Sequence, residues 1–193
     1  MMIHSVAVFG LLVSLVVTPA MSAKGDMVLI EVKGGTLAEP IKIADPRISE
    51  FNVWAGAGVN GAVLEAATGF IIDWQAGVVA QHAAGLPHYE VSFYAGCRVS
   101  DDPQCRAEKP RLVYVVPFDF DPWSGRGFVY LPRYGEPWFK LNSGTIYHMV
   151  EGHWFLASDS WKRFVRPFIV KAVDQTRDPV SVVHQSETAV HCE

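Results

Sequence analysis

Two histidines and a glutamate stand close together in the order His148, Glu151 and His153. Glu151 and Gly152 have the composition of a two-residue hairpin turn, which makes the two histidines diagonal neighbours on one face. Their Cβ atoms would then lie roughly 5.5–8 Å apart, near the range in which two imidazoles share a metal ion. No third ligand is evident nearby, so we favour two half-exposed hairpin histidines without a metal. His148 and His153 are weak metal candidates.

A pair of carboxylates, Asp119 and Asp121, lies in a segment rich in proline and glycine that is typical of a loop. Paired carboxylates can supply a general acid and base or bind calcium. Trp123 and Ser124 interrupt the spacing of a calcium-binding loop. Aspartate is common in turns because its side chain accepts hydrogen bonds from the nearby backbone. We therefore predict that both residues serve a turn.

Residues 56–61 match the pattern G-x-G-x-x-G. A dinucleotide-binding fold needs this pattern between a strand and a helix, with an acidic residue about 20 positions later. Here the pattern follows a predicted short helix, and Asp73 comes too early. We predict a loop and no cofactor. The chain has no G-x-S-x-G nucleophile elbow. Other hydrolase arrangements stay open, because a catalytic triad is recognised by its geometry.

Cys97 and Cys105 enclose a polar loop that contains a proline. In an oxidising compartment such a pair usually forms a disulfide, which for a short loop contributes roughly 2.5 kcal/mol. The alternative is two free thiols. A zinc site would need more ligands at tighter spacing. Cys192 is left over as a free thiol or an intermolecular link.

The first 23 residues contain no acidic residue, lysine or arginine, and residues 6–17 are almost wholly apolar. The apolar run, Pro19 and the small residues after it are typical of a signal peptide cleaved after Ser22 or Ala23. We therefore expect a secreted protein of the periplasm or extracellular space. The alternative is an uncleaved anchor, although the run is shorter than the roughly 20 residues of a membrane-spanning helix.

The formal net charge of −4, without a basic run, argues against nucleic acid or an anionic membrane surface as a partner. We expect residues 24–174 to form a single domain without a further membrane span. The polar residues 175–193 would form a flexible tail.

Alternating apolar residues predict several short strands. They cover residues 27–33, 40–44, 89–95, 111–118, 127–131, 138–141, 145–150 and 153–157. Residues 70–74 are a possible buried strand. Asp45 and Pro46 predict the start of a short helix, and residues 158–160 predict the cap of a C-terminal helix. Pro117 indicates an edge or a bend, and Pro167 a kink or an end of the last helix. The order of elements predicts an α+β fold built on an antiparallel β-rich meander.

Two stretches, ADPRISEFNVWAG (44–56) and VYVVPFDFDPWSGRGFVYLPR (113–133), resemble segments of exported bacterial proteins of uncharacterised function. The resemblance extends from about residue 27 to about residue 173. It implies export and a single domain, and it carries no activity and no site.

Aromatic side chains beside turns are candidates for a contact surface, because an exposed ring can stack on a sugar or on a partner side chain. The surface we predict comprises Asp119, Asp121, Trp123, Arg126 and Trp138. The alternative for both tryptophans is that they fold back over the core. The preferred function is a non-catalytic module that binds an envelope partner, an extracellular partner or a glycan. The competing function is a small exported hydrolase or metal-dependent enzyme that uses Asp119, Asp121, His148 or His153.

Overall fold

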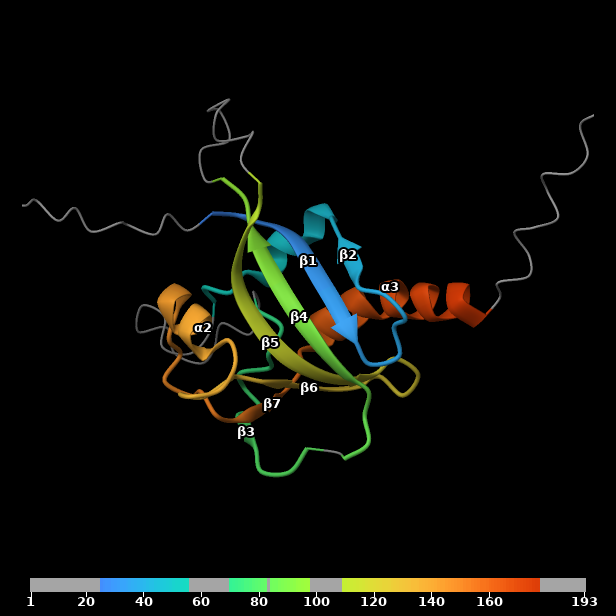
Figure 1. Cartoon of the computed structure of the whole chain (residues 1–193). Coiled ribbons are helices and arrows are strands. Elements are labelled where there is room, and N and C mark those ends of the chain that lie inside the picture. The colour runs from blue at the N-terminus through green and yellow to red at the C-terminus, as the bar shows by residue number, and fades with distance from the viewer. Residues whose placement is uncertain (1–24, 56–69, 83, 98–108, 178–193) are drawn as a thin grey trace, which may run out of the picture.

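The computed structural model describes residues 25–55, 70–82, 84–97 and 109–177 (Figure 1). The expected signal peptide, the G-x-G-x-x-G segment and Cys105 lie outside these residues. Most of the expected tail does too. Its first three residues, 175–177, instead continue the C-terminal helix.

One antiparallel sheet of seven strands organises the described residues, in the order β2-β1-β4-β5-β6-β7-β3. The bounds are β1 (Met27–Gly34), β2 (Ile41–Ile43), β3 (Val78–Val79), β4 (His88–Ala95), β5 (Arg111–Asp121), β6 (Arg126–Tyr130) and β7 (Trp154–Leu156). Three helical segments accompany it: η1 (Pro46–Phe51), α2 (Phe139–Thr145) and α3 (Asp159–Arg177). The predicted α+β class is therefore confirmed.

The sheet has one apolar face because side chains alternate along each strand. The register aligns Val32 with Val91 and Val91 with Val116, and all three are fully buried. The neighbouring rows on this inner face hold the large aromatic rings. Residues one position away point to the opposite, outer face, where Glu90 and Asp119 lie.

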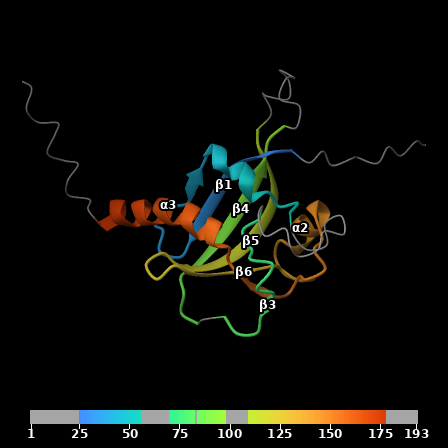
Figure 2. The same cartoon turned by 180° about the vertical axis from the view of Figure 1, so that it is seen from behind.

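Helix α3 covers the inner face, behind the sheet in Figure 1 and in front of it in Figure 2. The hydroxyl of Ser158 caps it by accepting a hydrogen bond from the Trp161 N–H at 3.2 Å. Trp161 is fully buried and contacts Phe51 of η1, Phe93 and Phe118. The helix does not end at Pro167. Among the described residues, no helix is long and apolar enough to cross a membrane.

The predicted strand at 138–141 is wrong, because these residues enter α2. Trp138 begins the helix in the left-handed region, at φ 69°. The buried Asn142 then fixes the helix on β5. Its Oδ1 accepts from the Val115 N–H at 2.9 Å, and its Nδ2 donates to the Val115 carbonyl at 2.7 Å. These tertiary bonds override the strand propensity of the aromatic residues.

The predicted hairpin of 145–150 with 153–157 is also wrong. A turn does occur at Glu151 and Gly152, but only residues 154–156 form a strand, which pairs with β6 and β3. Pro117 lies in a central strand. The pairing of β5 with β6 starts only at Phe118. The N–H that Pro117 lacks therefore falls beside the end of that ladder, where no partner strand needs it.

Candidate functional site

Asp119 lies at the centre of a polar cluster on the outer face of the sheet. The predicted loop position is wrong, because β5 continues through Asp121. The Asp119 Oδ1 lies 2.6 Å from His88 Nδ1, and its Oδ2 lies 3.2 Å from His82 Nε2. Asp119 is only 7% exposed. One buried carboxylate therefore holds two imidazoles.

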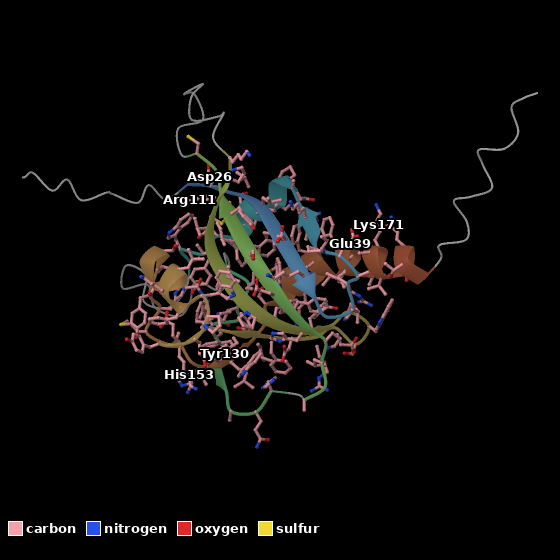
Figure 3. All side chains as sticks on the ribbon, in the orientation of Figure 1. Asp26, Glu39, Arg111, Tyr130, His153 and Lys171 are labelled. Carbon is pink, nitrogen blue, oxygen red and sulfur yellow. The ribbon has the colours of Figure 1, made fainter. Side chains whose placement is uncertain are left out.

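Aromatic rings hold His82 in this position. Its imidazole stacks on Trp154 with the centroids 4.0 Å apart, and Phe128 contacts it edge-on. Trp154 in turn packs against Tyr130, which lies at the lower end of the sheet in Figure 3. His82 thereby reaches the outer face of the sheet, where it contacts Asp119. Neither His82 nor His88 was singled out from the sequence. The signal for His88 was its place directly before a predicted strand whose neighbour carries Asp119.

A second polar network lies next to the cluster. The Glu90 carboxylate receives the Trp138 indole N–H at 2.9 Å, and it contacts the Lys33 ammonium at 2.7 Å. The hydrogen bond to Glu90 raises the pKa of Lys33 above its ordinary value. The positive φ of Trp138 is costly for a bulky residue and is kept by this bond and by α2. The indole N–H of Trp138 is therefore bonded within the protein and is not available to a ligand.

Both networks border one hollow of about 440 Å³. It is lined by Lys33, Gly34, Leu37, Ala38, Glu39, Pro40, His88 and Glu90. The side chain of His88 is 64% exposed there. When Asp119 is ionised it accepts from the Nδ1–H of His88, so Nε2 carries the lone pair and can accept a proton. An aspartate that fixes the tautomer of a histidine is one element of a general-base dyad.

The turn between β5 and β6 carries the other three predicted contact residues. Asp121 accepts the Trp123 N–H on its side chain and the Gly125 N–H on its carbonyl. The hydrogen bond from Ser124 is the main cause that lowers the pKa of Asp121. Asp121 therefore closes the turn. Trp123 is 52% exposed and Arg126 is exposed, so both face outward from the turn.

His148 and His153 do not lie together. His148 is fully buried among the rings of Phe70, Trp74 and Tyr114. His153 is exposed, with Nδ1 3.2 Å from the Val150 carbonyl. The predicted diagonal pair is therefore wrong, because residues 145–150 are not a strand. No group of three metal-ligating side chains occurs among the described residues.

An exposed aromatic patch surrounds α2. We define it as Tyr134, Phe139 and Tyr147. Tyr134 and Tyr147 both meet Phe139 edge-on, with centroids 5.6 and 6.4 Å apart. Tyr134 is 86% exposed and Tyr147 is 53% exposed. This patch was not predicted from the sequence, because Tyr147 was expected in a paired strand. The prolines and glycine around Tyr134 were the available signal.

Cys97 lies just beyond β4 and is disulfide-bonded. Its pairing with Cys105 stays a prediction, since Cys105 lies outside the described residues.

Comparison with protein-family models, with curated proteins and with solved structures finds no match to this chain.

Proposed function

We propose that this protein is a non-catalytic binding module of an exported compartment, and that it binds a polysaccharide through the aromatic patch. The observation that carries the proposal is the gathering of exposed rings around α2. A ring such as Tyr134, which is 86% exposed, leaves a face free to stack on a sugar. Exposed apolar groups that cluster commonly mark an interaction surface, whereas scattered ones need no explanation.

The edge-on contacts with Phe139 support the same conclusion. They restrict the two tyrosines before a partner arrives, so less side-chain entropy is lost on binding. Charged groups stand beside the rings: Arg133, paired with Glu136 at 2.9 Å, and the exposed Lys140. Such groups can hydrogen-bond sugar hydroxyls while the rings stack, which combines a polar rim with an aromatic centre.

The ionisable groups of the outer face also favour binding over catalysis. Lys33 is paired with Glu90, Glu90 also holds Trp138, and Asp119 holds His88 and His82. Each group is thus engaged within the protein, in pairs spread along an open sheet face. A catalytic site instead gathers a nucleophile, a base and the donors for the developing charge around one reacting atom.

Sedimentation with insoluble peptidoglycan, chitin and cellulose tests the proposal. The variant with Tyr134→Ala and Tyr147→Ala should bind about tenfold more weakly or worse, as expected for hot-spot aromatic residues. Tyr134→Phe keeps the ring and should bind like the natural protein. Equal sedimentation of the double variant would reject the patch. A loss confined to Trp123→Ala would place the contact on the β5–β6 turn instead.

A second candidate is a small exported hydrolase, which the Asp119–His88 contact specifically favours. His88 Nε2 would take a proton from water, the hydroxide oxygen would attack an ester carbonyl, and His88 would return the proton to the leaving alcohol. Chromogenic esters test this. His88→Gln and Asp119→Asn should each abolish turnover, whereas His153→Gln, at an exposed histidine elsewhere, should not. Absence of turnover by the natural chain across such esters would count against this candidate.

A further inference from the structure

A cavity at the start of α3 gathers three cations. It measures about 160 Å³ and is lined by Phe120, Gly125, Asp159, Lys162, Arg163 and Arg166. Helical spacing brings Lys162, Arg163 and Arg166 to one face, since residues three and four apart are neighbours. The β5–β6 turn forms the opposite wall through Gly125. This cavity lies on the α3 side of the sheet and belongs to neither the outer-face hollow nor the aromatic patch.

Neither arginine of this cavity forms an ion pair within the described part of the chain. Lys162 pairs with Asp159 at 2.8 Å, which leaves that carboxylate occupied. Arg163 and Arg166 are exposed and form no ion pair with a described residue. Asp159 stays ionised, because the hydrogen bond from Lys162 lowers its pKa. The cavity is therefore positive overall, and its two guanidinium groups are available to a ligand.

The walls favour an anion that is small. Phe120 is fully buried and contributes an apolar wall, beside which charge attraction is less screened than in open water. Gly125 has φ 73°, and the space beside it is open, since a Cβ there would meet no atom within 4 Å. Pockets for drug-sized ligands measure about 300–1,000 Å³, so this cavity accommodates one charged group.

We propose that this cavity binds a phosphate group, held by the guanidinium forks of Arg163 and Arg166 with Lys162 as a further donor. A guanidinium offers paired N–H donors that match two oxygens of a tetrahedral oxyanion, and such charge-assisted bonds are the strong ones. The group comes either as inorganic phosphate or as the phosphate monoester of a larger molecule, such as a sugar phosphate.

The test is an NMR titration of the full chain with inorganic phosphate and, separately, with glucose 6-phosphate. Saturable shifts are expected at the amides of Gly125 and of residues 162–166. The variant with Arg163→Gln and Arg166→Gln should bind at least about tenfold more weakly, because two charge-assisted contacts are lost. Tighter binding of glucose 6-phosphate would identify an ester as the source, and tighter binding of phosphate the free ion.

The matched control is Arg111→Gln, an exposed arginine at the other end of β5 (Figure 3). It should leave both titrations unchanged. Sodium chloride at the same ionic strength should give no saturable shift at these amides. The proposal is overturned if chloride reproduces the shifts, or if the double variant, folded by its amide spectrum, binds phosphate as the natural chain does. These readouts do not involve the aromatic patch, so they are independent of polysaccharide binding.

Discussion

At the scale of single residues, Asp119 shows how a strand pairing changes the meaning of a side chain. In sequence it is one of two aspartates near a turn, and only Asp121 accepts the hydrogen bonds that close the turn. The register of β4 against β5 places Asp119 opposite His88, and the Trp154 stack brings His82 to it. His82 comes from a segment whose path no local pattern indicates. Sequence reasoning could therefore find the carboxylate but not its contact with His82.

Truncation of Asp119 should destabilise the fold. Asp119→Ala removes the acceptor of two imidazoles, and each lost hydrogen bond costs about 0.5–1.5 kcal/mol net, because water reaches both partly exposed rings. Chemical denaturation of the natural chain and the variant measures the loss of unfolding free energy. Asp174→Ala, at an exposed position of α3, is the control and should stay within about 0.5 kcal/mol. Equal stability of both variants would show that the two contacts contribute nothing net.

Tyr130 should titrate late. Burial, together with the hydrogen bond from its hydroxyl to Glu136, raises the pKa of Tyr130 to about 12. The unfolded side chain loses its proton near 10, so this group's contribution to stability is complete below about pH 10 and is lost as the pH rises to about 12. Glu136→Gln removes a charge that opposes ionisation, and should move the phenolate midpoint of Tyr130 downward. Ultraviolet titration, with Tyr130→Phe to assign the signal, measures this. An unmoved midpoint would leave burial as the sole cause.

At the scale of elements, the residues that agreed with prediction carry local signals. Asp45 accepts the Arg47 N–H at the start of η1, Ser158 caps α3, and the hairpin of β5 with β6 follows alternating side chains. The strands predicted within 138–157 were largely wrong, because the structure of this segment depends on distant partners. Trp138 is held by Glu90 and Asn142 by Val115, both from strands far away in sequence. The aromatic patch lies on this same segment, so it was missed with it.

Asn142 should therefore stabilise α2 more than any propensity within its seven residues. Asn142→Ala leaves the buried N–H and carbonyl of Val115 without their side-chain partners, which we expect to cost about 2–4 kcal/mol. Hydrogen exchange should also accelerate across α2, because the helix is too short to persist alone. Urea unfolding and exchange mass spectrometry measure the two effects. Lys140→Ala, an exposed neighbour on α2, should change neither. Retained protection of α2 in Asn142→Ala would show that apolar packing suffices.

At the scale of the whole molecule, the two faces of one sheet differ in polarity and in role. The inner face, covered by α3 and η1, is almost entirely apolar and supplies the core. The outer face carries the polar networks, and the patch around α2 and the turn at Trp123 remain open to solvent. Alternation along the strands predicted that such a division exists. It did not predict which tryptophans lie inside, since a tryptophan beside a turn can fold back or point outward.

Trp161 and Trp123 should differ sharply when truncated, and the pair tests this division. Trp161 joins η1, β4, β5 and α3 through ring contacts and is fully buried, so Trp161→Ala should cost about 3–5 kcal/mol through lost burial and the cavity left behind. Trp123 is 52% exposed at the tip of a turn that Asp121 closes, so Trp123→Ala should cost less than about 1 kcal/mol. Urea unfolding of both variants under identical conditions measures the difference.

A loss at Trp123 as large as that at Trp161 would mean that this ring covers the end of the sheet, and it would remove Trp123 from the predicted contact surface. A small loss keeps it there, in the turn that also lines the cavity at the start of α3 through Gly125.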